Sequence, residues 1–505
     1  MTPVQRIYTD EELDVLATPR SILLERAVAA RDADAVRAVQ ADMDIECLAI
    51  YDAYMNWMGV LQTFILARTS EEAHDRALLW SADQAARPFV ERLRDAGAAE
   101  RAGWLAARLR SSGSTFSVEQ DDVRIRFRCD PWGALRQWRA PAGWQAGGEP
   151  RHRDGDRIRY PCYGHYASSA AFRELRGARP LTHGRETLPS LIAAEIIFLE
   201  IVPTELFGAP LAVIELPERL DDPVHLDVYT DPGAIPAEAY ARFGMAKPAA
   251  GSLPAGSSRP LSDEELRRMG MPLSLQVEEA LGAGDWDRLL EISAAMDAEL
   301  VNAKDPMGVQ IAALLTWIAR HLGEAAAEEA LAETAVVVMT PFLDVVRDLH
   351  IADAITVWAI AWRSHGSTFW IEEDDQRFVL RGRPLGACHR MWSHAYQPEV
   401  ERISESRVRY PTFGSYDGPG SFHLMREPRG ITHGKVGYPI YSCHCHMLHE
   451  IFPIDQLGHP LWVELHPLHD RDGETVHIHY KDPADWPERY YEQVGRRKPV
   501  ASAAG

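Results

Sequence analysis

The chain has 505 residues, of which 46% are apolar, and a formal net charge of −21 at pH 7. This length and composition are typical of a globular protein with roughly two to four domains. The negative charge, without any cluster of Lys and Arg, excludes nucleic acid and an anionic membrane as partners, because both bind clustered positive charge.

The N-terminus and the cysteines indicate the compartment. The first residues, Met-Thr-Pro-Val-Gln-Arg, lack the pattern of a signal peptide, and no apolar run in the sequence reaches the roughly 18 residues needed to span a bilayer. Six cysteines are too few for a disulfide framework in a chain of this length. We therefore expect a cytoplasmic protein with reduced thiols.

Helices are predicted to open the chain. Residues 21–66 and 70–110 are rich in Ala, Leu, Arg and Glu, with apolar residues at the three- and four-residue spacing of a helix. The period then changes, and residues 116–127 predict two strands joined by an acidic turn. A further strand is predicted at 211–216, followed by a linker rich in Pro, Ala, Gly and Ser at 247–260.

The same order of elements is predicted again after the linker. Helical spacing returns at 262–298 and 307–362, then a hairpin at 369–380 and a strand at 461–466. Short motifs also recur: Gly-Ser-Thr-Phe at 113–116 and 366–369, Arg-Tyr-Pro at 159–161 and 409–411, and Thr-His-Gly at 182–184 and 432–434.

These repeats predict an α+β fold built by tandem internal duplication. The first copy is expected at 1–250 and the second at 262–498, each a helical subdomain followed by a small sheet-containing subdomain. Two such copies form a pseudo-dimer within one chain, which predicts either a stable monomer or a homo-oligomer.

A cluster of metal-ligand residues occurs in the second copy alone. Residues 441–450 read Tyr-Ser-Cys-His-Cys-His-Met-Leu-His-Glu. In register with the repeated motifs, Cys443, His444, Cys445, His446 and His449 stand opposite Ala193, Ala194, Glu195, Ile196 and Leu199. The first copy thus has the same module without the cluster, although Glu200 stands opposite Glu450.

The segment 440–451 is predicted to be a helix that stops near Pro453, because its counterpart 191–200 is strongly helix-forming. At roughly 100° per residue, one face of this helix carries five donors within an arc of about 160°. They are Cys445, His449, His446, Glu450 and Cys443, with His444 outside the arc.

Thiolate and imidazole ligands together favour zinc, with iron or copper as alternatives. We predict a metal site formed by Cys443, Cys445, His449 and Cys388, the last because it also occurs only in the second copy. Glu450, His446 and His365 are the predicted catalytic residues, although a structural role for Glu450 is an equal alternative because Glu200 persists without the cluster.

Other residues near the cluster admit simpler interpretations. His183 and His433 occur in both copies and are predicted to serve the fold, and His477 with His479 is predicted to form a solvated strand face. Aromatic residues around the cluster could form a pocket or ordinary core: Trp370, Trp392, Tyr410, Phe413, Tyr416, Tyr438 and Tyr441.

Because the first copy is expected to fold without the cluster, a catalytic metal is favoured over a structural one. We therefore predict a metal-dependent enzyme that acts on a small organic molecule by hydrolase or lyase chemistry. The alternatives are a non-haem iron or copper oxidoreductase, and a metal- or ligand-sensing protein without catalysis.

Overall fold

The structure is a computed structural model with an α+β fold, 55% helical with small antiparallel sheets. It describes residues 6–130, 132–133, 153–154, 157–158, 174–220, 222–249, 259–347, 349–383, 385–394, 397, 399–412, 414–417 and 420–499. No described helix combines the length and the apolar character that a membrane span requires.

The chain divides into two compact units. Unit 1 consists of Met1–Ala27, Gly147–Tyr163 and Ile311–Gly505, and unit 2 of Val28–Ala146 and Gly164–Gln310. Two helices contain residues of both units, α2 (Arg20–Ala29) and α12 (Trp286–His321).

Unit 2 has a four-stranded antiparallel sheet in the order β1-β2-β8-β7. Its strands are β1 (Phe116–Gln120), β2 (Arg124–Cys129), β7 (Val213–Glu215) and β8 (Val224–Tyr229), and β5 (Glu174–Arg176) pairs with β6 (Thr187–Pro189). Its helices are α3 (Ala33–Arg68), α4 (Glu71–Arg92), α5 (Ala98–Ser111), α7 (Ser190–Ile196), α8 (Val202–Phe207), α9 (Ala237–Ala241), α10 (Asp263–Met269) and α11 (Leu273–Ala283), with a π-helical segment at Ile197–Ile201 and short 3-10 turns at Pro180–Thr182 and Pro232–Ala234.

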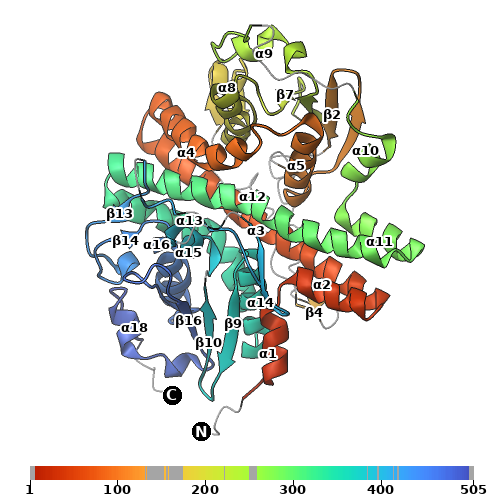
Figure 1. Ribbon diagram of the computed structural model, residues 1–505. Coiled ribbons are helices and arrows are strands. Elements are labelled where there is room, and N and C mark those ends of the chain that lie inside the picture. The colour runs from red at the N-terminus through yellow and green to blue at the C-terminus, as the bar shows by residue number, and fades with distance from the viewer. Residues whose placement is uncertain are drawn as a thin grey trace. The chain divides into compact units, whose positions relative to one another are not determined.

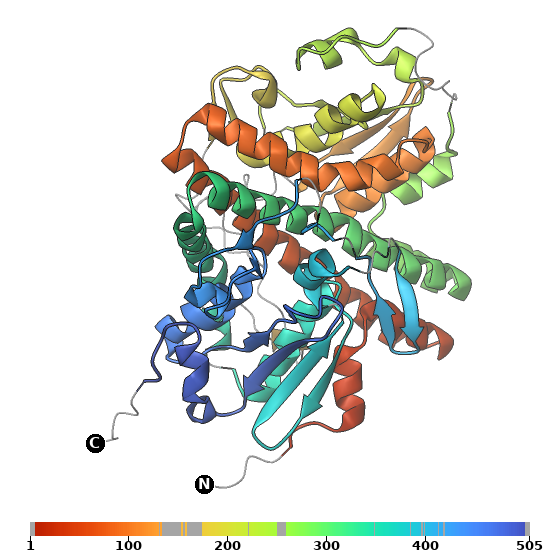
Figure 2. The ribbon, with the colours of Figure 1, turned by 60° about the vertical axis from the view of Figure 1, so that its left-hand side comes forward.

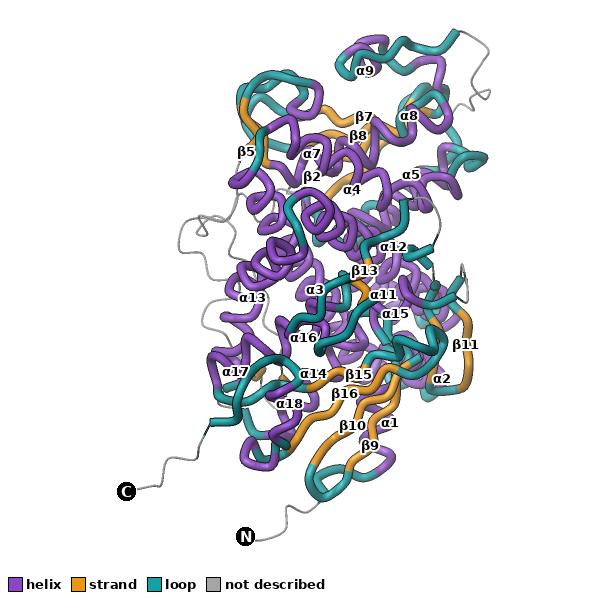
Figure 3. Tube along the Cα trace, turned by 90° about the vertical axis from the view of Figure 1, so that its left-hand side faces the viewer, coloured by secondary structure: helices purple, strands orange, loops and turns teal. Residues whose placement is uncertain are grey.

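Unit 1 has a second sheet in the order β9-β10-β16-β15, whose strands run side by side in Figure 3. They are β9 (Phe369–Glu373), β10 (Arg377–Gly382), β15 (Val463–Leu465) and β16 (Thr475–Tyr480); the small pairs are β3 (Arg153–Asp154) with β4 (Arg157–Ile158), β11 (Glu401–Ser404) with β12 (Arg407–Arg409), and β13 (Leu424–Met425) with β14 (Tyr438–Pro439). The helices are α1 (Asp10–Ala17), α13 (Glu324–Val346), α14 (Ile351–Ser364), α15 (Gly386–Trp392), α16 (Cys443–His446), α17 (Phe452–Leu457) and α18 (Glu488–Glu492), with a π-helical segment at Met447–Ile451 and 3-10 turns at Gly430–Thr432 and Pro483–Asp485.

The predicted hairpins are confirmed in both sheets. β1 pairs with β2 and β9 pairs with β10, each across an acidic turn. Asp121 closes the first turn by accepting hydrogen bonds from the backbone N–H of Val123 and Arg124, and Asp374 does the same in the second. A carboxylate that satisfies two backbone donors in this way fixes the register of the strands on either side.

The predicted helix at 440–451 is wrong in its limits and in its regularity. Helix α16 begins at Cys443, passes into the π-helical segment Met447–Ile451, and continues through Pro453 to Leu457. Proline is tolerated here because the carbonyl of His449, which it cannot serve, accepts a hydrogen bond from the N–H of Leu461 at 2.9 Å. The same arrangement joins Leu199 to Leu211 in unit 2.

Helix α1 packs within unit 1 against β9 and α14, and Figures 1 and 2 both show it beside the hairpin of β9 and β10. Glu373 accepts hydrogen bonds from the N–H of Ile7 and Tyr8, and the Tyr8 hydroxyl donates to the carbonyl of Ala352 at 2.7 Å. Within unit 2, α10 packs against β1. Each sheet is therefore covered by a short helix that lies far from it along the chain.

Candidate metal and acid–base site

The interior of unit 1 behind the π-helical segment is rich in buried polar side chains. Helix α16 packs against β15, and α13 packs against the π-helical segment. The buried polar residues of this layer are His389, His444, His446, Glu450, Glu464, His466, His477 and His479. Burying a polar group lowers the stability of a protein unless the group has a hydrogen-bond partner or a bound ion. The buried polar groups of this interior therefore need such partners.

Unit 2 has apolar residues at the matching places. Ile214 lies opposite Leu226 in the sheet of unit 2, where Glu464 lies opposite His477 in unit 1. The N–H of Ile214 donates to a carboxylate oxygen of Glu200 at 2.9 Å, and the N–H of Glu464 donates to Glu450 at 3.2 Å. The two units therefore share this backbone hydrogen bond and strand pairing. The apolar pair of unit 2 is a carboxylate and an imidazole in unit 1.

A first group, here called the thiol–carboxylate cluster, consists of Cys388, Cys445 and Glu464. One ligand atom from each of these buried residues lies within 4.8 Å of the others. Cys388 is held in the first turn of α15 by Gly386, whose φ of 68° suits glycine and whose N–H donates to the Ser367 hydroxyl at 2.8 Å. Sulfur and carboxylate ligands thus converge from α15, α16 and β15.

Glu464 has one satisfied and one unsatisfied oxygen. The Nε2 of His477 lies 3.0 Å from Oε2, whereas Oε1 makes no hydrogen bond of normal geometry, although the Cys445 thiol lies close by. Burial acts to raise the pKa of Glu464, but the hydrogen bond and charge of His477 outweigh it and hold the pKa well below its usual range. A buried, ionised carboxylate whose second oxygen makes no hydrogen bond of normal geometry is suited to bind a cation.

The protonation states of the nearby sulfur and nitrogen donors decide how they can bind a metal ion. Burial lowers the pKa of His444 to about 4, so its ring is neutral at pH 7. Its Nδ1 donates to the Tyr441 carbonyl, which leaves the lone pair on Nε2, 3.5 Å from the Cys445 sulfur. Burial raises the pKa of Cys445 well above its usual value. This thiol therefore stays protonated unless a cation stabilises the thiolate.

A second group, the histidine–glutamate cluster, consists of His433, His446 and Glu450. His433 Nε2 lies 3.0 Å from Glu450, and the rings of His433 and His446 stack at 3.5 Å. His446 donates from Nδ1 to the Ile431 carbonyl at 2.8 Å and accepts at Nε2 from the Tyr438 hydroxyl at 3.1 Å. Both nitrogens of His446 are therefore satisfied by the protein.

Unit 2 contains the same histidine–glutamate pair with a different neighbour. His183 Nε2 lies 2.7 Å from Glu200, and Arg242 forms an ion pair with that carboxylate at 3.3 Å. Gln493 takes this place in unit 1 and donates an amide hydrogen bond to Glu450 at 3.2 Å. Burial raises the pKa of Glu450 to about 7, since an amide supplies no charge to oppose it.

The structure brings some of the predicted ligands together and separates others. Cys388 and Cys445 share the thiol–carboxylate cluster, but the Cys443 thiol bonds to the Pro439 carbonyl at 3.6 Å instead. His449 stacks on Trp462 at 3.7 Å, and its Nδ1 has no hydrogen-bond partner. The π-helical segment changes the angular spacing after His446, so the five donors do not converge on one point as predicted.

The three predicted catalytic residues are divided between two places in unit 1. Glu450 and His446 belong to the histidine–glutamate cluster. His365 caps the C-terminal end of α14, with its ring 5.7 Å from that of Trp362. It lies beside Cys388, because a Cβ on Gly386 would contact both side chains at about 4 Å.

The prediction that His477 and His479 form a solvated face is wrong. Both are buried, His477 against Glu464 and His479 against Trp358 and Trp462. Glu464 was missed altogether. Comparison of the two copies along β7 and β15 could have found it, because Ile214 and Leu226 stand where Glu464 and His477 do.

The aromatic residues are mainly core. Trp392, Tyr410, Tyr416, Tyr438 and Tyr441 are buried, Trp370 is half-buried, and Phe413 lies outside the described residues. The Tyr416 hydroxyl accepts a hydrogen bond from the N–H of Tyr441 at 3.1 Å, which ties the core to the start of α16.

Comparisons of the chain with models of protein families, with curated proteins and with solved structures give no match. We therefore infer function from the geometry of unit 1.

Proposed function

We propose that unit 1 is a metal-dependent enzyme module whose metal, zinc, is bound by Cys388, Cys445 and Glu464. The observation that supports this most directly is the buried Glu464 carboxylate, which has one oxygen, Oε1, without a hydrogen bond of normal geometry and one oxygen within 4.8 Å of the thiols of Cys388 and Cys445. A divalent cation would satisfy this carboxylate and replace the thiol protons. Glu464 is not needed for the sheet, since unit 2 has Ile214 in its place.

Zinc fits this donor set best, because it combines thiolate, imidazole and carboxylate ligands. Three protein ligands would leave a fourth position for a substrate or water, which is the arrangement of catalytic zinc sites. His444 is the alternative fourth ligand, with its Nε2 at 3.5 Å from the Cys445 sulfur. A site closed by His444 would be structural or sensory instead.

We assign proton transfer to Glu450, with His446 and His365 as further candidates. The pKa of Glu450, raised to about 7, suits a group that exchanges protons near neutral pH. Its Oε1 accepts from the backbone N–H of Glu464, so the two clusters are adjacent. Metal and acid–base groups side by side support hydrolase or lyase chemistry on a small organic molecule.

One alternative has its own support. His433, His446 and Glu450 form a two-histidine, one-carboxylate set of the kind that holds iron in non-haem oxygenases. Against it, both nitrogens of His446 have protein partners, and the pair of His183 and Glu200 in unit 2 resembles His433 and Glu450 without any third ligand. Zinc at the thiol–carboxylate cluster is therefore preferred over an iron oxidoreductase.

We also infer that the chain arose by tandem duplication of one α+β module. Support comes from the equal strand order of the two sheets, the π-helical segment in each unit, and the histidine–glutamate pair in each. We also propose that the protein is cytoplasmic, a compartment in which the free cysteines of the described residues would stay reduced.

The test is the metal content of the purified protein and of single variants. Glu464→Gln, Cys388→Ser and Cys445→Ser should each lower zinc from about one ion per chain to a small fraction, since each removes a ligand. Cys443→Ser is the matched control, because its thiol bonds to Pro439 and it should keep full zinc. Full zinc in Glu464→Gln would refute the site, and bound iron lost only in His446→Ala would favour the alternative.

A further inference from the structure

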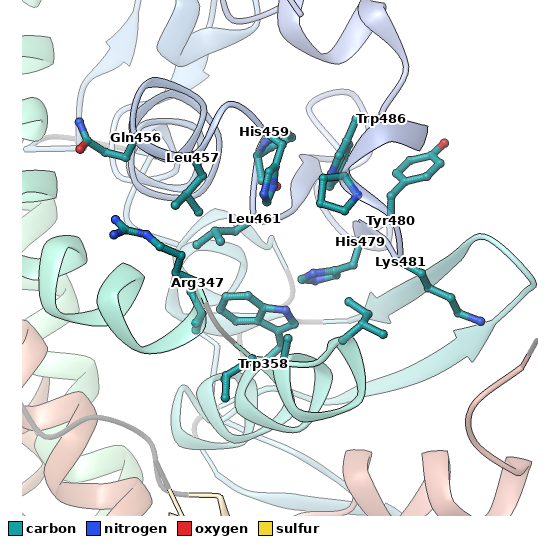
Figure 4. Close-up of a pocket in the computed structure, with 16 residues that line it drawn as sticks. Arg347, Trp358, Gln456, Leu457, His459, Leu461, His479, Tyr480, Lys481 and Trp486 are labelled. Carbon is teal, nitrogen blue, oxygen red and sulfur yellow. The ribbon is translucent and has the colours of Figure 1, made fainter. Parts of the chain in front are cut away.

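A cavity of about 390 Å³ opens on unit 1 near the thiol–carboxylate cluster. Its walls come from the end of α13, the start of α14, the loop after α17 and the end of β16 (Figure 4). A volume of this size is within the range of small-molecule sites. Unlike the buried clusters, it is accessible to a ligand from solvent.

The cavity has aromatic walls suited to a flat molecule. Trp358 and His479 lie next to each other along one wall, with Leu461 nearby and Tyr480 and Trp486 on the far side (Figure 4). Aromatic rings bind planar apolar groups by stacking and by edge-to-face contact. A ligand with a flat apolar part therefore suits this lining, in which Tyr480 is more exposed than the buried rings of Trp358, Trp486 and His479.

The lining also has a positive character in a strongly acidic protein. The described residues that line the cavity include two cations, Arg347 and Lys481, and none of them is acidic. Lys481 is paired with Glu373 at 2.7 Å, whereas Arg347 lies 3.8 Å from Asp344 and its side chain is 54% exposed. Arg347 is thus the group best able to bind an anion.

His479 adds a buried polar group that faces the cavity. It is 1% exposed, and neither ring nitrogen makes a hydrogen bond of normal geometry, although the backbone of Leu461 lies nearby. Figure 4 shows its ring directed into the cavity next to Trp358. A buried imidazole of this kind is satisfied by a ligand that accepts or donates a hydrogen bond.

A short chain of contacts links the cavity to the thiol–carboxylate cluster. Trp358 and His479 both contact Trp462, with ring centres 4.6 and 5.5 Å apart. Trp462 stacks on His449 at 3.7 Å and on His477 at 5.8 Å, and His477 bonds to Glu464. Trp462 and His477 therefore connect the lining of the cavity to the Glu464 carboxylate.

We propose that the cavity binds a small planar organic anion, such as an aromatic carboxylate, with its ring against Trp358 and His479 and its charge toward Arg347. As the substrate class of unit 1, this assignment rests on the proposed function. As a binding site, it stands on the cavity alone.

The experiment measures binding of three probes of equal shape, benzoate, benzamide and benzylamine, by titration calorimetry at millimolar concentration. Benzoate should bind, benzamide roughly tenfold more weakly, and benzylamine more weakly still. Arg347→Gln should lower benzoate affinity about tenfold and leave benzamide unchanged. Arg94→Gln is the matched control, since Arg94 is likewise exposed and follows α4 as Arg347 follows α13, and it should change nothing.

The outcomes separate this inference from the metal site. Benzoate that binds equally to wild type and Cys445→Ser, with metal lost only in the variant, supports both. Benzoate binding that depends on Arg347 in a protein without metal keeps the cavity and refutes the proposed function. No probe binding, equal binding of all three probes, or unchanged benzoate affinity in Arg347→Gln overturns the cavity assignment even if zinc is bound.

Discussion

Glu464 and Ile214 have the same backbone contacts in two sheets of equal strand order, yet one is a buried carboxylate and the other an apolar side chain. A buried carboxylate paired with an imidazole contributes little net stability, because both groups lose their hydration. The polar pair in unit 1 therefore costs stability unless a cation binds to it.

This loss of stability predicts the effect of replacing Glu464 and His477 by the apolar residues found at the matching places of unit 2. The double substitution Glu464→Ile with His477→Leu should raise the free energy of unfolding by about 1–4 kcal/mol in the presence of a chelator, because well-packed apolar groups replace a buried ion pair. Urea denaturation of both proteins measures the difference. The reverse change, Ile214→Glu, should destabilise unit 2, and a double variant less stable than wild type would contradict the argument.

The Glu450 carboxyl predicts a specific pH dependence. Its folded pKa, raised by burial to about 7 from 4.5, means that the folded state binds more protons than the unfolded state between these values. Its contribution to stability is thus greatest below pH 4.5 and is lost as the pH rises to about 7.

Gln493→Arg should remove that loss, because it supplies the charge that Arg242 provides to Glu200 in unit 2. Relative to wild type, this variant should gain on the order of 2–3 kcal/mol between pH 5 and pH 7.5. Denaturation at the two pH values gives the difference, in which the other titrating groups cancel. Gln493→Met is the neutral control, and an equal gain in it would rule out the charge explanation.

At the scale of elements, the sequence predicts most helices and both hairpins but not the π-helical segment. A hairpin produces a local period of apolar residues that can be recognised in the sequence. The hairpins predicted at 116–127 and 369–380 are therefore confirmed. The wide turn at Met447–Ile451 depends instead on a distant donor, the N–H of Leu461, which compensates for Pro453. No local pattern reveals such a partner.

The candidate site was predicted in part for the same reason. Cys388 and Cys445 are predicted as ligands because they occur in the second copy alone, and their sulfur atoms do lie within 4.8 Å of each other. Glu464 and His477 lie in strands whose local sequence pattern does not mark them as metal ligands. They lie near the thiols because β15 packs against α16. Tertiary packing, not sequence spacing, decides which donors converge.

Helix α1 gives a prediction for an element far from its sheet along the chain. Leu13 is 3% exposed in unit 1, whereas Val15 on the same helix is 43% exposed. Leu13→Ala should lower the free energy of unfolding by about 2–4 kcal/mol, and Val15→Ala should change it by less than about 0.5 kcal/mol. Hydrogen exchange should locate the loss of protection in β9 and β10. Loss of protection in β1 and β2 instead would contradict the packing of α1 within unit 1.

At the scale of the whole molecule, the two units differ in their buried histidines. Burial lowers the pKa of His389, His444 and His446 to about 4 and that of His433 and His466 to about 3, all in unit 1. Each of these rings is neutral in the folded state but gains a proton in the unfolded state below pH 6.5. Stability of unit 1 should therefore fall as the pH drops from 6.5 to about 4, and several such groups together amount to several kcal/mol.

Unit 2 should not share this sensitivity, because apolar residues such as Ile214, Leu226 and Leu199 replace the polar layer. Hydrogen exchange of the chelator-treated protein at pH 7 and pH 5, corrected for the intrinsic rate, separates the two. Protection should fall at pH 5 in Met447–Ile451 and β16 of unit 1, and stay unchanged in Ile197–Ile201 and β8 of unit 2. If zinc at the thiol–carboxylate cluster holds this interior together, adding zinc at pH 7 should raise protection in unit 1 alone. Equal loss of protection in both units at pH 5 would show that the buried histidines do not control the acid stability of this protein.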